Sequence, residues 1–159
     1  MKRAVCPGSF DPITFGHIDI IERASQQFDE VVVAVLANRT KASLFSVEER
    51  MEMIRQTTSK FKNVRVDSWH GLLVEYCKAN SIQAIVKGLR AVTDFDYELQ
   101  MAQVNLQGSG VETMFMATAP AHSFLSSSIV KELAHFGGDV SSMVPGIVND
   151  ALKARVAGK

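Results

Sequence analysis

Five short apolar runs, rich in Val and Ile, alternate with helical patterns along the chain. The runs lie at residues 3–6, 31–37, 64–67, 84–86 and 112–117, and the helical patterns lie near 17–28, 47–59, 72–80, 95–107, 127–136 and 145–156. Strands that are apolar throughout and followed by helices are typical of a parallel sheet covered on both faces. Right-handed crossovers then favour a doubly wound α/β fold with five parallel strands, built as one domain over residues 1–159.

Composition and charge narrow the classes of function. The chain has 17 Lys and Arg against 17 Asp and Glu, and this balance argues against a broad nucleic-acid or membrane surface. No apolar run reaches transmembrane length. The two cysteines, Cys6 and Cys77, form no C-x-x-C pair, and the N-terminus has the pattern of a strand, so we expect a reduced, cytoplasmic setting.

The first connection carries the clearest functional signal. In doubly wound sheets, ligands bind beyond the carboxyl ends of the strands, and the segment Pro7-Gly-Ser-Phe-Asp-Pro-Ile-Thr-Phe-Gly-His17 follows the first strand. It ends in the first turn of a helix, where unpaired N–H groups and positive potential favour an anion. No P-loop, dinucleotide fingerprint or nucleophile elbow occurs in the chain. The segment therefore predicts a phosphate-handling turn, with a tight turn and a capping or core-facing His17 as the alternative.

Two further loops carry cations. Lys41 lies just before Ser46-Val-Glu-Glu49, a capping box that starts the second helix, and it is either a phosphate ligand or a solvated surface lysine. Lys87-Gly-Leu-Arg90 continues directly from the buried fourth strand, so both cations are expected to face a ligand. Gly88 between them would permit close backbone approach to that ligand.

The last helix-opening segment is rich in serine. Any residue of Ser126-Ser-Ser can cap the helix, and no carboxylate appears before Glu132, so its first-turn amides are available to a polyphosphate or to water. Asp94 and Asp96 are interpreted as partners of a helix dipole. Tyr97 or Glu98 would reach a ribose or support Arg90, and His122 would border the nucleotide.

These segments resemble a known family. Thr14-Phe-Gly-His17 is similar to the (H/T)-x-G-H signature of the nucleotidylyltransferase superfamily, and Ser126-Ser-Ser with Lys131 resembles its I-S-S-T-x-x-R signature. The whole 7–17 segment, Phe45-Ser-x-Glu-Glu-Arg50, the block 88–98 and the block 123–132 together resemble the bacterial phosphopantetheine adenylyltransferases. The resemblance covers essentially the whole chain.

The resemblance implies a Rossmann-like nucleotidyltransferase fold and a step of coenzyme A biosynthesis. ATP and 4′-phosphopantetheine would give dephospho-coenzyme A and pyrophosphate, with Mg²⁺ carried by the ATP phosphates and no metal ligand from the protein. The attacking group is already a phosphate anion, so no covalent intermediate is needed. The family also implies a homohexamer that coenzyme A inhibits, with no nucleic-acid or membrane partner.

The site residues implied by the resemblance fall into three groups. The catalytic group is His17, Lys41 and Arg90, with His17 donating to the α-phosphate. The phosphopantetheine group is Ser9, Lys41, Leu73 and Lys87. The ATP group is Ser9, Phe10, His17, Gly88, Leu89, Arg90, Glu98, His122, Ser123, Phe124, Leu125, Ser126, Ser127 and Ser128.

Three positions depart from the family pattern. Lys87 stands where the family usually has arginine, and lysine loses the two-pronged contact that arginine makes with a phosphate. His122 stands where Trp or Tyr is common, and Ser9 replaces threonine in part of the family.

Two alternatives remain at the level of the sequence. One is another transferase of the superfamily, acting on nicotinamide mononucleotide or on a phosphorylated alcohol with CTP. The other is a non-catalytic nucleotide-binding module on the same fold. The presence of His17, Lys41 and Arg90 together favours an enzyme.

Overall fold

A five-stranded parallel sheet forms the centre of the computed structural model, which describes residues 1–37 and 42–158 apart from the side chains of 92 and 93. The strand order is β3-β2-β1-β4-β5. The strands are β1 (Arg3–Gly8), β2 (Glu30–Leu36), β3 (Val64–Trp69), β4 (Ala84–Leu89) and β5 (Glu112–Ala117). The helices are α1 (Phe15–Ser25), α2 (Val47–Thr58), α3 (Leu73–Ala79), α4 (Val92–Ser109), α5 (Ser127–His135) and α6 (Gly146–Ala157), with a short 3₁₀ turn, η1 (Pro120–His122). The predicted five-stranded parallel α/β fold is confirmed.

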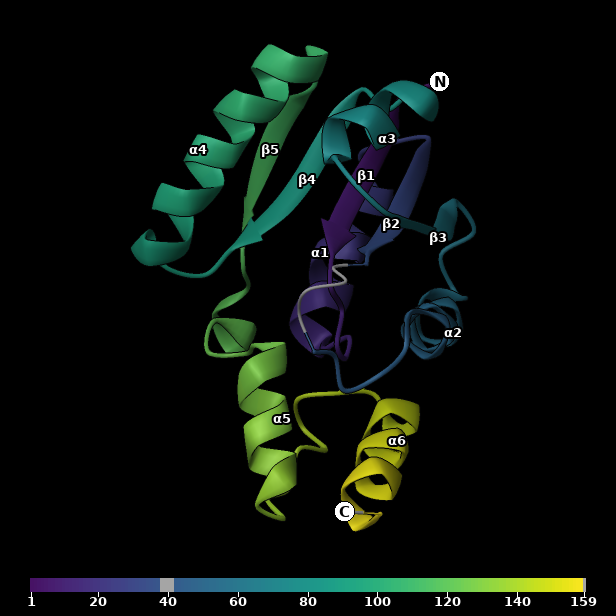
Figure 1. Ribbon diagram of the computed structural model, residues 1–159, viewed down its shortest axis with the longest axis vertical. Coiled ribbons are helices and arrows are strands. Elements are labelled where there is room, and N and C mark those ends of the chain that lie inside the picture. Colours follow the sequence, from purple (N-terminus) through teal and green to yellow (C-terminus); the bar gives the residue numbers. More distant parts are fainter. Residues whose placement is uncertain (38–41, 159) are drawn as a thin grey trace.

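Helices cover both faces of the sheet. On one face, α1 and α2 bury Ile21 and Ile54 against the strands in a cluster that also takes in Leu152 of α6. On the other face, α3 buries Tyr76 and Cys77, and α4 packs against α3 and β5. Figure 1 shows α5 and α6 beyond the carboxyl edge of the sheet, so these two helices extend the fold below the strand ends.

Strand β4 is longer than the sequence predicts. It continues through Lys87 and Gly88 to Leu89, and these residues lie in parallel register with Phe115, Met116 and Ala117 of β5. The expectation that Lys87 and Gly88 lie in a loop is therefore wrong. A lysine followed by a glycine is typical of a strand end, and the pairing with β5 that extends this strand is a long-range contact.

The starts of two helices are fixed by reciprocal hydrogen bonds. The predicted capping box of α2 is confirmed, because Ser46 Oγ accepts from the Glu49 amide at 3.1 Å and Glu49 Oε2 accepts from the Ser46 amide at 2.7 Å. A second capping box starts α1 with Thr14 and His17, so the capping role that the sequence left open for His17 is confirmed. Among the described residues, no helix is both long enough and apolar enough to cross a membrane.

Candidate active site

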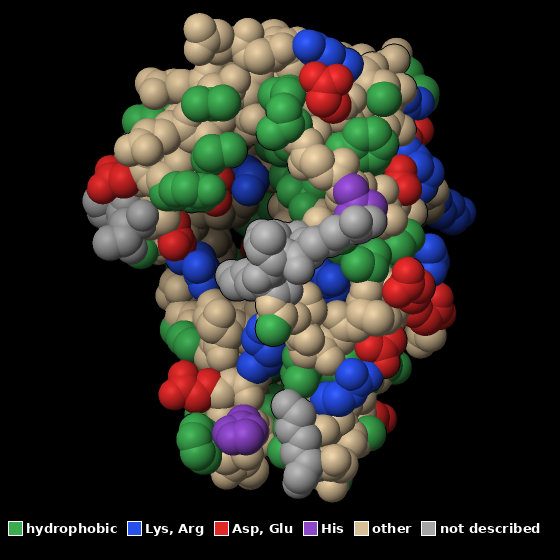
Figure 2. Space-filling view, viewed as in Figure 1, with side chains coloured by type: hydrophobic (Ala, Val, Ile, Leu, Met, Phe, Trp, Pro, Cys, Tyr) green, Lys and Arg blue, Asp and Glu red, His purple; other side chains and the backbone are tan. Residues whose placement is uncertain are grey.

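A cavity of about 380 Å³ lies at the carboxyl edge of the sheet, where β1 and β4 are neighbours and the chain switches from one half of the sheet to the other. Lys and Arg side chains border a hollow in the middle of the face shown in Figure 2. The residues of the predicted site that line this cavity are Ser9, Phe10, His17, Lys87, Gly88, Arg90, Glu98, His122, Leu125, Ser126, Ser127 and Ser128. Segments distant in the sequence thus meet around one volume of a size suited to a small ligand.

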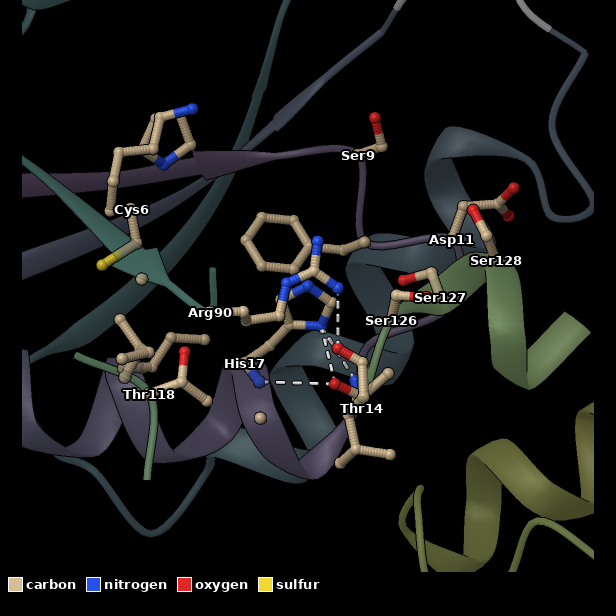
Figure 3. A pocket seen from close by; sticks show the side chains of 18 of the residues that line it. Cys6, Ser9, Asp11, Thr14, His17, Arg90, Thr118, Ser126, Ser127 and Ser128 are labelled. Atoms are coloured by element: carbon tan, nitrogen blue, oxygen red, sulfur yellow. Dashed lines mark hydrogen bonds between the residues drawn. The ribbon is translucent and has the colours of Figure 1, made fainter. Parts of the chain in front are cut away.

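His17 has a defined tautomer. The backbone amide of Thr14 donates to His17 Nδ1 at 3.0 Å, and Thr14 Oγ1 lies 3.2 Å from the same nitrogen (Figure 3). Because an amide can only donate, Nδ1 is an acceptor, and the proton of the neutral ring lies on Nε2. Burial, together with the nearby positive charge of Arg90, lowers the pKa of His17 from 6.5 to about 4. At neutral pH, His17 is therefore an uncharged N–H donor in the cavity wall.

Phe10 closes one side of this histidine. Its ring packs edge-on against the His17 ring, with centroids 5.0 Å apart, and the side chain is buried. The Phe10 backbone has φ +48°, a left-handed conformation that a bulky residue rarely adopts. Such backbone strain is found mostly at functional sites. The turn after β1 is thus shaped around the histidine.

Arg90 ties β4 to the segment before α5. Its Nη1 donates to the Leu125 carbonyl at 2.8 Å, and its Nε lies 3.1 Å from Asp94 Oδ2. Asp94, interpreted from the sequence as a partner of the helix dipole, is also the carboxylate that supports Arg90. Among the described residues, Asp94 rather than Glu98 or Tyr97 supports Arg90, so that expectation is wrong; Tyr97 is exposed.

Glu98 instead pairs with Lys87, the basic residue within β4. Lys87 Nζ lies 3.3 Å from Glu98 Oε2, and both side chains are only about a quarter exposed. Glu98 follows Asp94 by one helical turn, so the two carboxylates of α4 lie side by side and pair with Lys87 of β4 and with Arg90, the residue after β4. Lys87 and Arg90, two of the cations of the cavity wall, are therefore each paired with a carboxylate of α4.

The serine-rich segment starts α5 as predicted, and Ser126 is the residue that caps it. Ser126 Oγ accepts from the Ile129 amide at 3.1 Å, and the first turn of α5 contains no acidic residue. Ser127 Oγ donates to the Pro12 carbonyl at 2.8 Å and so binds α5 to the turn after β1. Ser128 is exposed at the cavity. The positive end of the α5 dipole thus adjoins the cavity.

Four predicted residues do not line the cavity in the part of the chain that the structure describes. They are Leu73, Leu89, Ser123 and Phe124. Leu73 packs with Trp69 against the second core, and the Leu89 carbonyl accepts from Thr118. Lys41 lies outside the described residues, so its role stays a prediction.

Gly88 is required for packing. A Cβ at this position would lie 2.9 Å from Ile20 Cγ1 and 3.2 Å from its Cδ1. Gly88 also lines the cavity, so its close approach to a ligand stays a prediction, while its absent side chain makes room for α1. The nearest atoms in the structure belong to the helix that carries His17.

Three charged residues of the cavity wall had no role in the sequence analysis: Asp11, Arg50 and Lys131. Asp11 lies within the 7–17 segment, and Lys131 belongs to the second signature. Arg50 is 4% exposed although it is charged. The burial of Arg50 could have been predicted from its spacing from Val47 and Ile54, because this spacing places Arg50 on the apolar face of α2.

No group of three or more His, Cys, Asp or Glu side chains within residues 1–37 and 42–158 is arranged to hold a metal ion. Both carboxylates that line the described cavity are paired with cations, Glu98 with Lys87 and Asp11 with Lys131, and the Arg90 side chain of the cavity wall pairs with Asp94.

The fold and the site define a nucleotidyltransferase. A sequence profile of the cytidylyltransferase-like family matches residues 5–133. A solved structure of a candidate nicotinate-nucleotide adenylyltransferase from Vibrio parahaemolyticus superposes with a TM-score of 0.60 at 18% identity, covering 96% of this chain and 99% of that one. A lipopolysaccharide core biosynthesis protein from Thermoplasma volcanium superposes with a TM-score of 0.54 at 25% identity, covering 75% of this chain and 97% of that one.

Curated relatives narrow the class to one family. The phosphopantetheine adenylyltransferase of Streptomyces coelicolor is 63% identical over 156 residues, which is 98% of each chain. That of Frankia alni is 61% identical over 159 residues, again 98% of each chain, and that of Frankia casuarinae is 60% identical over 161 residues, or 99% of each. The chain belongs to the phosphopantetheine adenylyltransferase family.

Proposed function

We propose that this cavity transfers the adenylyl group of ATP to 4′-phosphopantetheine, giving dephospho-coenzyme A and pyrophosphate in coenzyme A biosynthesis. The observation that carries the proposal is the placing of His17, an uncharged Nε2–H donor at the start of α1, in the same cavity wall as the cation Arg90. Family membership supplies the two substrates.

The reaction proceeds in one displacement. An oxygen of the phosphopantetheine phosphate attacks the α-phosphorus of ATP, a new P–O bond forms, and the bond from the α-phosphorus to the bridging oxygen breaks. Pyrophosphate leaves with that electron pair. The nucleophile is already anionic, so the protein need only align the two phosphates and stabilise the charge that develops.

The residues divide this work by position. His17 donates its Nε2 proton, in a hydrogen bond, to an oxygen of the α-phosphate. Arg90 and the amino end of α5 bind the β- and γ-phosphates, where positive charge and a helix dipole favour an anion. Ser9, Lys41 and Lys87 hold the phosphate of phosphopantetheine. The exposed Ser9 side chain and the Lys87 ammonium both reach the cavity from the β1–β4 edge.

Mg²⁺ enters this scheme as part of the nucleotide substrate. The carboxylates described at the cavity are paired with Lys or Arg, a donor set that suits binding of phosphates better than binding of a divalent cation. When present, the ion neutralises charge on the phosphates and the leaving pyrophosphate.

We extend the proposal to assembly and regulation. Tyr97 and Val104 of α4 are 64% and 58% exposed, and Met114 of β5 is 48% exposed, so apolar surface gathers along the β5 edge. A homohexamer of 17.4 kDa chains would cover such surface, and light scattering measures its mass directly. Coenzyme A contains the pantetheine moiety of the acceptor, so we expect it to compete for the acceptor part of the cavity.

A reducing, cytoplasmic compartment suits the two cysteines. Cys6 and Cys77 are free and buried, and they belong to the cores on opposite faces of the sheet. Burial raises the pKa of the Cys6 thiol to about 12 and that of Cys77 to about 11. Both side chains therefore act as apolar core residues rather than as partners in a disulfide.

The test is pyrophosphate release from ATP and Mg²⁺, measured without an acceptor, with 4′-phosphopantetheine, and with nicotinamide mononucleotide as the control acceptor. Release that depends on 4′-phosphopantetheine supports the proposal. Release with the control acceptor alone assigns a different transferase of the superfamily. Binding of ATP without any release assigns a nucleotide-binding module.

A further inference from the structure

The carboxylate of Asp11 joins three separate segments at the cavity. Its Oδ1 accepts from the Phe45 amide at 2.9 Å, and its Oδ2 accepts from the Leu44 amide at 2.9 Å and from Lys131 Nζ at 3.1 Å. The residue is 5% exposed. Burial alone would raise the pKa of this carboxyl, but the two amides and Lys131 outweigh it and hold the pKa below its usual value. Asp11 is thus a buried, ionised group with fixed partners.

The segment that holds Asp11 is itself anchored from both sides. Arg50 Nη1 donates to the Ser9 carbonyl at 2.8 Å, which fixes the turn after β1 next to Asp11. Arg155 of α6 donates to the Leu44 carbonyl at 2.9 Å and pairs with Glu49. The amides that bind Asp11 therefore belong to backbone that is held in place independently of Asp11.

Lys131 is the partly exposed partner of Asp11. It lies one turn after Ser128 in α5, its side chain is 32% exposed, and it lines the cavity. A lysine side chain is a flexible stem whose ammonium has three N–H donors. Contact with Asp11 uses one donor and leaves two for an anion in the cavity. Holding the stem before the anion binds removes part of the entropy cost of ordering it.

We propose that Asp11 is a positioning residue, which holds the Lys131 ammonium at the cavity so that its remaining N–H groups bind a phosphate of the nucleotide. This inference rests on the proposed function only for the identity of that nucleotide. It assigns Asp11 a role in substrate binding that acts through Lys131. The competing reading is that Lys131 only neutralises a buried carboxylate that stabilises the turn.

A double-mutant cycle separates these readings. The variants are Asp11→Asn, Lys131→Met and the double variant, assayed for kcat and for KM of ATP and of 4′-phosphopantetheine. We expect Asp11→Asn to lower kcat/KM for ATP about tenfold, as for loss of one hydrogen bond to a charged group, with the KM for phosphopantetheine unchanged. In the Lys131→Met background, Asp11→Asn should change kcat/KM by less than about twofold. An equal loss in both backgrounds overturns the proposal.

Glu49→Gln is the matched control. It makes the same carboxylate-to-amide change beside the same backbone segment, weakens the contact with Arg155 and keeps a side chain that is accepted in a capping box. It does not touch Lys131. A loss of kcat/KM for ATP as large as that of Asp11→Asn would show that the segment, rather than Lys131, carries the effect, and would overturn the proposal.

A readout on the unmodified chain covers the case in which Asp11→Asn does not fold. The Lys131 ammonium is followed by ¹⁵N NMR, with its signal assigned by its loss in Lys131→Met. We expect slow hydrogen exchange in the free protein that persists when a non-hydrolysable ATP analogue binds, because the Asp11 contact is kept. An ammonium that exchanges rapidly in the free protein overturns the proposal. The proposed function has its own test: it fails if the wild-type chain releases no pyrophosphate with 4′-phosphopantetheine. In that case, the dissociation constant of ATP replaces kcat/KM as the quantity measured for each variant of the double-mutant cycle.

Discussion

The backbone amide of Thr14 donates to Nδ1 of His17, and the His17 amide in turn donates to Thr14 Oγ1 at 3.4 Å. One reciprocal contact thus starts helix α1 and fixes the position of the imidazole proton. The sequence analysis treated capping and phosphate binding as alternatives for His17. The structure shows the capping contact, and it makes the two roles compatible, because the ring caps through Nδ1 and its proton lies on Nε2.

Removal of this donor is expected to affect kcat rather than KM. His17→Ala should lower kcat by about 10²–10³-fold, which is typical of one lost transition-state donor. Thr14→Ala is the comparison, because it removes the hydroxyl and keeps the amide that sets the tautomer. It should cost about 1 kcal/mol of stability through the lost cap, with a much smaller effect on kcat. Steady-state kinetics and urea unfolding measure both; a His17→Ala variant altered only in KM would mean that the histidine binds ground state and transition state equally.

The lowered pKa of His17 also predicts a pH dependence of stability. Above pH 6.5 the ring is neutral in both folded and unfolded chains and contributes nothing to the dependence. Below pH 6.5 the unfolded chain binds a proton that the folded chain, with a pKa of about 4, does not bind. The free energy of unfolding should therefore fall by up to about 1.4 kcal/mol per pH unit, reaching about 3 kcal/mol near pH 4.

Urea unfolding of the wild-type chain and of His17→Gln at pH 7, 6 and 5 isolates this contribution. The difference in unfolding free energy between the two chains should change across this range, because only one of them carries the buried imidazole. Asp11 does not interfere, since its lowered pKa places its own loss of stability below pH 3.8. A constant difference from pH 7 to pH 5 would show that His17 titrates normally in the folded chain.

The sequence predicted the fold well because its signals are local. Apolar runs such as 31–35 are buried throughout, and the alternation with helices leaves few arrangements. The partners of charged groups were not predicted. Whether Arg90 meets Asp94 or Glu98 depends on the rotation of α4 relative to β4, which long-range packing sets. The burial of Arg50 likewise depends on long-range packing.

The departure at Lys87 gives a prediction for the acceptor. Lys87→Met should raise the KM for 4′-phosphopantetheine by about 10–100-fold, because a charged hydrogen bond is lost, with a smaller effect on the KM for ATP. Lys87→Arg keeps a cation for both Glu98 and the phosphate, and its planar head can bind the phosphate through two donors. It should leave kcat unchanged and keep or lower the same KM. Severe loss of activity in Lys87→Arg would mean that the cavity is built around the smaller ammonium.

Gly88 links the packing of α1 to catalysis. In Gly88→Ala, the added Cβ would stand 2.9 Å from Ile20 Cγ1, so α1 or β4 must shift. We expect a loss of about 1–3 kcal/mol in the free energy of unfolding. Ile20 lies one turn after His17, so the shift should also lower kcat. Gly146→Ala is the matched control, since within the described residues its added Cβ would meet no atom within 4 Å outside its chain neighbours and its own helix backbone. At this helical position stability should stay equal or rise. In a Gly88→Ala, Ile20→Ala double variant the contact is relieved, so its two losses should be less than additive. Additive losses would show that Ile20 is not what excludes a side chain at position 88.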